Sequence, residues 1–258
     1  MNNMTDYSNG SIDFTKDSGI GTIEFFHPKG NSLPETLLRK LARTITEAGK
    51  DNDVRVVVIR SKKNGPFCAG ASFDELLAIS DIEQGKEFFM GFAHILNAMR
   101  SCPNLIVLRI QGKTVGGGVG IAAAADFTIA HNSASVKLSE LALGFGPFVV
   151  GPAVIRKIGI SSFSTLSLDA HNWYDAEWAE SKGLYNKRCD TFNELDASVN
   201  KLAGELAQSN PRSMTELKQI MWQSTGHWDS TLEQRAAISG RLVQSEYTRN
   251  YIEEFRKM

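Results

Sequence analysis

The chain has 258 residues, enough for one large domain or two modest ones, and folding at this size buries roughly three-quarters of the unfolded surface. Its 28 lysine and arginine residues balance 29 aspartate and glutamate residues, which gives a net charge of −1 without long blocks of one sign. This balance predicts no nucleic-acid partner and no membrane partner, and it favours small-molecule chemistry. The three cysteines are too widely spaced to indicate a disulfide framework or a zinc cluster, and they fit a reducing compartment.

The N-terminal segment 1–10 is polar and lacks the basic and apolar pattern of a signal peptide. No apolar run approaches the length of about twenty residues that a membrane-spanning helix requires. We therefore expect a cytoplasmic protein. The five histidines show no metal-ligand spacing with nearby carboxylates, so no metal site is predicted.

The first half of the chain alternates strand and helix patterns. Alternating apolar residues on both sides of Asp17-Ser18-Gly19 predict a hairpin, and an apolar stripe at helical spacing follows Pro34. Continuous apolar runs at 54–59 and 105–110 are typical of strands covered on both faces. This alternation predicts an α/β fold.

The second half changes character at Asp190, after which only helical patterns remain. Asn210-Pro211 is typical of a helix start, with an N-cap followed by proline at the first helical position. The spacing Ser230-x-x-Glu233 predicts a capping box and thus another helix start.

Two glycine-rich turns, at residues 65–76 and 112–120, each follow a predicted strand and open a helix. The first N–H groups of such a helix have no carbonyl partners and point at one spot under the positive end of the helix dipole. We interpret the two turns together as a cradle that aims two donors at one developing oxyanion. Neither has the spacing of a nucleotide-binding loop, and the chain has no G-x-S-x-G nucleophile elbow.

These turns resemble those of the crotonase family, also known as the enoyl-CoA hydratase/isomerase family. The resemblance extends over nearly the whole chain. The resemblance implies that the backbone N–H groups of Ala71 and Gly117 bind a thioester oxygen. It also implies that the stretch 137–147 places a catalytic carboxylate at Glu140.

The same resemblance implies a fold and an assembly. Residues 1–195 would form a spiral of strand–strand–helix units that carries the acyl-CoA site. Residues 196–258 would form a helical oligomerisation region. We expect a homotrimer or a dimer of trimers.

Glu140 lies in an otherwise apolar stretch, where desolvation would raise its pKa toward the range useful for moving a proton on carbon. The residues alone favour a surface glutamate on a short helix, and the resemblance reverses that preference. Hydratases of this family usually carry a first glutamate three residues after the middle glycine, where this chain has Gly120. A lone carboxylate fits hydration by one group, double-bond isomerisation, or decarboxylation or hydrolysis.

Substrate-binding residues follow from the resemblance as well. Their positions are Ala69, Gly70, Ser72, Phe73, Asp74 and Gly118 around the turns, Lys29 as a partner for a CoA phosphate, and Phe148 in the acyl pocket. The bulk of Phe145 and Phe148 predicts a pocket for a short or branched acyl group. CoA is part of the substrate, so no separate cofactor is expected.

The leading hypothesis is hydration or dehydration of a short or branched enoyl-CoA, with a methylglutaconyl-like group among the candidates. The alternative is an enoyl-CoA double-bond isomerase that uses the lone glutamate. A third hypothesis is a homologue that binds acyl-CoA without turning it over, because Gly120 replaces a catalytic carboxylate.

Overall fold

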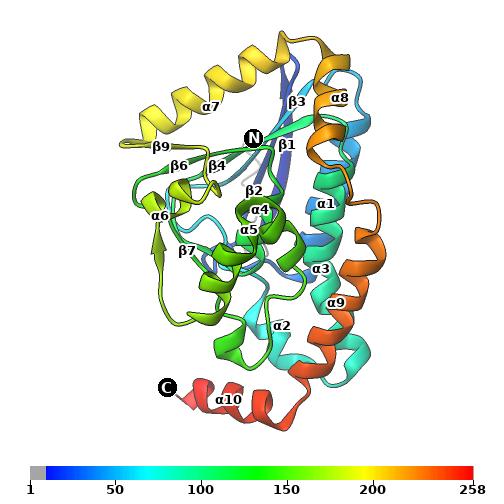
Figure 1. Cartoon of the computed structure of the whole chain (residues 1–258), viewed down its shortest axis with the longest axis vertical. Coiled ribbons are helices and arrows are strands. Elements are labelled where there is room, and N and C mark those ends of the chain that lie inside the picture. Colours follow the sequence, from blue (N-terminus) through cyan, green and yellow to red (C-terminus); the bar gives the residue numbers. More distant parts are fainter. Residues whose placement is uncertain (1–9, 258) are drawn as a thin grey trace, which may run out of the picture.

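The computed structural model describes the backbone of residues 10–257 and side chains as far as residue 251. The segment 1–9, which carries most of the expectation about targeting, lies outside the described residues. A six-stranded sheet forms the centre of the described part of the chain (Figure 1). Its strands are, in order, β1 (Ser11–Asp17), β2 (Ile20–Phe26), β3 (Val56–Ser61), β4 (Leu105–Ile110), β6 (Phe127–His131) and β9 (Lys187–Cys189).

The strand predictions for the large sheet are confirmed with small shifts. β1 and β2 form the predicted antiparallel hairpin, and the other neighbours in the sheet pair in parallel. β3 begins at Val56, two residues after the predicted start of the apolar run, and β4 has the predicted bounds. Every residue of β4 is buried, as expected for a strand covered on both faces.

The chain also forms a smaller, three-stranded sheet, and Cys68 extends it through a parallel bridge to Thr114. Its strands are β5 (Thr114–Val115), β7 (Ser135–Lys137) and β8 (Tyr174–Asp175). The chain repeatedly passes through a strand of the large sheet, a strand of the small sheet and then a helix, which confirms the predicted spiral. The helices that close two successive units are α4 (Gly117–Ala124) and α5 (Gly151–Leu168).

Helices cover both faces of the large sheet. On one face lie α1 (Glu35–Lys50) and α3 (Ile82–Ser101), which share a single apolar core with the sheet. α7 (Phe192–Ala207) covers the other face, where Leu195 and Val199 pack against the sheet. The predicted apolar stripe of α1 is fully buried and consists of Leu37, Leu38, Leu41, Ala42, Ile45 and Ala48.

The chain after Asp190 is helical as predicted, with one wrong start. α8 (Pro211–Met221) begins after Asn210, whose side-chain oxygen accepts hydrogen bonds from the N–H groups of Arg212 and Ser213. α9 (Trp228–Val243) begins before Ser230, so the predicted capping box is wrong. The Ser230 hydroxyl instead donates to the carbonyl of His227, inside the first turn.

The remaining helices are α2 (Phe73–Ala78), the 3-10 turn η1 (Leu141–Leu143), α6 (Ala176–Ser181) and α10 (Glu246–Lys257). In Figure 1, α9 runs alongside α3, and α10 lies across the end of the molecule near η1. The boundary predicted at residue 195 falls inside α7, and an oligomerisation role for the C-terminal helices stays a prediction. Within residues 10–257, no helix is long and apolar enough to cross a membrane.

Candidate active site

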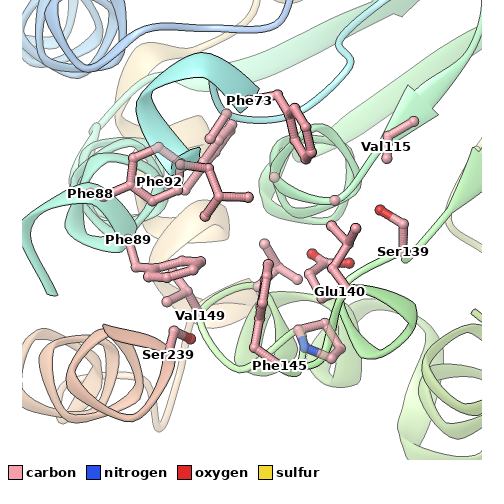
Figure 2. Close-up of a pocket in the computed structure, with 18 of the residues that line it drawn as sticks. Phe73, Phe88, Phe89, Phe92, Val115, Ser139, Glu140, Phe145, Val149 and Ser239 are labelled. Atoms are coloured by element: carbon pink, nitrogen blue, oxygen red, sulfur yellow. The ribbon is translucent and has the colours of Figure 1, made fainter. Parts of the chain in front are cut away.

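A cavity of about 370 Å³ lies where α2, α3, α4, α9 and the segment around η1 meet (Figure 2). Much of its wall is aromatic. The rings come from Phe73, Phe88, Phe89, Phe92, Phe145 and Phe148. Phe89 of α3 and Phe145 after η1 are in edge-to-face contact, with ring centroids 5.2 Å apart. The cavity therefore suits an apolar group with a few polar contacts.

Strand pairing brings the two glycine-rich turns to this cavity. Cys68 accepts a hydrogen bond from the N–H of Val115 at 2.8 Å, which holds the two segments in a parallel register at the bridge between Cys68 and Thr114. Ala71 and Gly117 each lie three residues beyond that bridge. Both therefore leave the small sheet at the same level, and both line the cavity.

Two glycines turn the following N–H groups away from the sheet. Gly70 has φ +90° and Gly116 has φ +54°, a region that residues with a side chain rarely adopt. Each of them directly precedes a predicted donor. The described backbone hydrogen bonds include none that is donated by the N–H of Ala71 or of Gly117. The two N–H groups are therefore available to a ligand oxygen.

The neighbourhood fixes the first of these donors in place. Leu33 pairs with the Ala71 segment on both sides, donating to the carbonyl of Gly70 at 2.8 Å and accepting from the N–H of Ser72 at 3.0 Å. The Ser32 hydroxyl donates to the carbonyl of Ala71 at 2.9 Å. Ser72 also caps α2, because its side-chain oxygen accepts from the N–H of Glu75. Such a preorganised donor needs no rearrangement when charge develops on the ligand.

Glu140 lies between the small sheet and η1, and its carboxylate faces the same cavity. A methyl group added at Gly116 would lie 3.1 Å from Oε1 of Glu140, so the carboxylate rests against the bare backbone that precedes Gly117. Oε2 of Glu140 is buried and has no hydrogen-bond partner. Burial raises the pKa of the Glu140 carboxyl to about 7, and a hydrogen bond from its own backbone N–H opposes this only in part.

Gly120 lies one turn further along α4 than Gly116, and its described neighbours are aliphatic. Gly120 is buried, and a methyl group there would lie 2.6 Å from Cγ1 of Val150 and 3.6 Å from Leu96. Val150 also lines the cavity. Aliphatic groups thus fill the space into which a side chain at residue 120 would extend. Among the described lining residues, Glu140 and Asp74 are the carboxylates.

Asp74 lies at the mouth of the cavity together with Lys29. The ammonium of Lys29 forms an ion pair with the Asp74 carboxylate, and both side chains are about two-thirds exposed, 66% and 67%. The charge of Lys29 is therefore already compensated, and a CoA phosphate would have to compete with Asp74. A pair this exposed has a small net energy, so such competition is feasible.

The structure places all predicted site residues on the cavity wall except Gly118. Gly118 packs against Cys68 instead, because a methyl group there would lie 2.8 Å from Cβ of Cys68. Its lack of a side chain serves the close approach of the two turns, and its contact with substrate stays a prediction. Within the described residues, no group of three or more histidine, cysteine, aspartate or glutamate side chains is placed to hold a metal ion.

Several cavity residues were missed by the sequence analysis. Phe88, Phe89 and Phe92 have the helical spacing of core residues, and they do pack in the core while one side of them faces the cavity. Ser239 comes from α9, about a hundred residues after Glu140 in the chain. The sequence holds no signal for it, because its role depends on how α9 packs against α3.

The fold and the cavity define a crotonase-type protein. An enoyl-CoA hydratase from Bacillus halodurans has the same fold, with a TM-score of 0.86 at 19% identity over 94% of this chain and 99% of that one. The sequence matches the family Enoyl-CoA hydratase/isomerase over residues 15–255. The protein belongs to the enoyl-CoA hydratase/isomerase family.

Two relatives illustrate the range of reactions in proteins similar to this one. The human mitochondrial methylglutaconyl-CoA hydratase is 31% identical over 192 residues, which is 73% of this chain and 56% of that protein. The ethylmalonyl-CoA decarboxylase of Gallus gallus is 28% identical over 184 residues, 70% of this chain and 61% of that protein. The chain thus spans less than two-thirds of the length of either relative.

Proposed function

We propose that the protein hydrates a short or branched enoyl-CoA, or dehydrates the product, through an enolate held by the N–H groups of Ala71 and Gly117. The observation that carries this proposal is the buried carboxylate of Glu140, whose Oε2 has no partner among the described residues, in the same cavity as those two donors. A pKa of about 7 allows Glu140 to accept a proton and return it at neutral pH.

The proposed reaction uses one carboxylate twice. Glu140 takes a proton from water while the water oxygen bonds to the β-carbon, and the double-bond electrons move to the thioester oxygen. The donors at Ala71 and Gly117 stabilise the resulting enolate. Glu140 then returns the proton to the α-carbon, and the electrons leave the oxygen. No electron is gained or lost overall, so the reaction needs no cofactor besides the CoA of the substrate.

The acyl group is proposed to be short or branched because Phe145, Phe148 and the rings of α3 restrict the cavity. The similarity to the human methylglutaconyl-CoA hydratase supports a branched acyl group. A homotrimer or dimer of trimers is proposed on the family resemblance, and a cytoplasmic location is proposed because the three widely spaced cysteines fit a reducing compartment. Light scattering of the purified protein tests the assembly.

Isomerisation is the second candidate, and the aliphatic wall at Val150 favours it. Moving a double bond requires only that one base take a proton from the α-carbon and return it to the γ-carbon. Glu140 with an enolate at Ala71 and Gly117 meets this requirement, and no water has to be held on the side of Gly120.

The test measures the purified protein with crotonyl-CoA, methylglutaconyl-CoA and a 3-enoyl-CoA, together with the binding of CoA alone. Hydration of one of the first two above the rate of Glu140→Gln supports the proposal. Turnover of the 3-enoyl-CoA alone supports the isomerase. Binding of acyl-CoA without turnover of any of them supports the third hypothesis, a binding protein, and contradicts both enzymes.

A further inference from the structure

Within residues 10–251, two polar atoms of the cavity wall are buried without a hydrogen-bond partner: Oε2 of Glu140 and Oγ of Ser239. Buried polar groups in folded proteins almost always have partners, because an unpaired one carries its full desolvation cost. The carboxylate of Glu140 has a role in the proposed reaction. Ser239 has none, although its side chain is only 1% exposed.

Ser239 projects from α9 into the part of the cavity that is remote from Glu140. Figure 2 shows it beside Phe89 and Val149, with Phe145 between it and Glu140. Helical serines commonly donate to the carbonyl four residues earlier, and Ser239 forms no such bond. The next residue, Gly240, packs directly on Gly85 of α3, with a methyl group at Gly85 only 2.8 Å from Cα of Gly240. This helix contact holds the hydroxyl at the cavity wall.

We propose that Ser239 determines specificity by hydrogen bonding to a neutral oxygen, hydroxyl or carbonyl, near the far end of the acyl chain. The proposal rests on acyl-CoA binding as proposed above and adds the chemical class of the acyl group. A hydroxyl group both donates and accepts, so it pairs with either oxygen type. The bond replaces the partner that the protein does not supply.

The charges around the cavity disfavour an acidic chain end at Ser239, so this inference narrows the proposed substrates to short or branched enoyl-CoAs without a terminal carboxylate and excludes methylglutaconyl-CoA. Among the described lining residues Lys29 is the cation, and it lies at the mouth in an ion pair with Asp74. Lys86 is near α9 but pairs with Glu233 and does not line the cavity. A carboxylate near Ser239 would therefore be buried among Phe88, Phe89 and Val149 without a counter-ion, which is costly.

The test measures dissociation constants by calorimetry, so it does not depend on turnover. Saturated acyl-CoA thioesters of four, six and eight carbons are compared with the same chains ending in a hydroxyl, a methyl ketone or a carboxylate. At one chain length, the wild type is expected to bind the hydroxyl or the ketone about 3- to 10-fold more tightly than the plain chain. The dissociation constants of the hydroxyl and ketone chains are measured separately. The chain that ends in a carboxylate is expected to bind more weakly than both.

Ser239→Ala should abolish that preference while leaving the affinity for the plain chain equal or higher. The matched control is Ser167→Ala, because Ser167 is also a buried serine with an unpartnered hydroxyl but lies in α5 outside the cavity wall. Its preference should remain that of the wild type. An unchanged preference in Ser239→Ala, no preference in the wild type, or tightest binding of the carboxylate would each overturn the proposal. Failure to bind any acyl-CoA would overturn the proposed function as well.

Discussion

Two glycines one turn apart at the start of α4, Gly116 and Gly120, have chemically different neighbours. On the side of Gly116, a buried carboxylate rests against bare backbone and keeps an unpartnered oxygen. On the side of Gly120, Val150 and Leu96 occupy the space that a second acid would need. The difference teaches that the cavity has room for one buried carboxylate and not for a second at residue 120, which is why the proposed reaction uses a single acid/base group.

A large effect is expected from removing one of the proposed oxyanion donors. Gly117 is the first residue of α4, a position that tolerates proline, but a side chain there would collide with the ring of Phe92. Gly117→Pro in a Phe92→Ala background removes one N–H and should lower kcat by a factor of about 10²–10³ relative to Phe92→Ala alone. Circular dichroism must show that both variants fold. A folded double variant as active as Phe92→Ala would refute the donor role of Gly117.

The raised pKa of Glu140 predicts a large pH effect on stability. Its carboxyl pKa rises from 4.5 to about 7 on folding, so between these values the folded state binds more protons than the unfolded state. The free energy of unfolding therefore falls as pH rises from 4.5 to 7, by roughly 3 kcal/mol in total. Glu140→Gln should remove this loss and be more stable than the wild type at pH 8, but not at pH 4.

Urea unfolding of both proteins at pH 4 and pH 8 measures this difference. Activity supplies a second readout, because kcat/KM should rise with pH through about 7 as Glu140 ionises and becomes a base. Equal stability of the two proteins at both pH values would show that the carboxylate is better solvated than its buried position implies.

Restoring an acid on the closed side should have a moderate effect, and only after space is made. Gly120→Glu alone overpacks the contact with Val150, which typically costs about 1–3 kcal/mol before the burial of charge is counted. In a Val150→Ala background, Gly120→Glu should raise crotonyl-CoA hydration about tenfold over Val150→Ala and lower 3-enoyl-CoA turnover. A stable single variant Gly120→Glu with increased hydration would contradict the view that this side is closed.

The smallest effect concerns the shape of the acyl pocket. Phe148 lines the cavity and is half-buried, with its ring against Gly146. Phe148→Ala should shift the preference in kcat/KM toward longer acyl chains by about 5-fold, which is the lower end of the roughly 1–3 kcal/mol that one methylene in an apolar pocket is worth. The control is Phe192→Ala, whose ring stacks on His131 away from the cavity. Identical shifts in both variants would mean that Phe148 does not limit chain length.

The sequence predicted the local features of this molecule well. The hairpin around Ser18, the buried stripe of α1 and the cap at Asn210 depend on patterns within a few residues, and all three are confirmed. Glu140 was expected to be buried from its apolar neighbours together with the resemblance. The capping box at Ser230 failed because the chain offers another start two residues earlier, at Trp228.

Features that depend on contacts between distant segments were not predictable. The packing of Gly118 against Cys68 is one contact that the sequence did not predict. Lys29 was expected to be free for a phosphate, although Asp74 lies beside it in the fold. Val150 lies beside Gly120 although it is thirty residues away in the chain, and it occupies the space that a glutamate at residue 120 would need. The periodicity of the sequence contains no information about that contact.

Exchange of the α-protons of butyryl-CoA with D₂O tests the single-carboxylate account most directly, because it needs only a base and an enolate and is common to hydration and isomerisation. The wild type should exchange these protons. Glu140→Gln should exchange them about 10²–10⁴ times more slowly while binding butyryl-CoA with unchanged affinity. The matched control is Glu75→Gln. Glu75 accepts a hydrogen bond from the N–H of Glu35 and does not line the cavity, so this variant should exchange the protons at the wild-type rate. Wild-type exchange in Glu140→Gln would contradict the account.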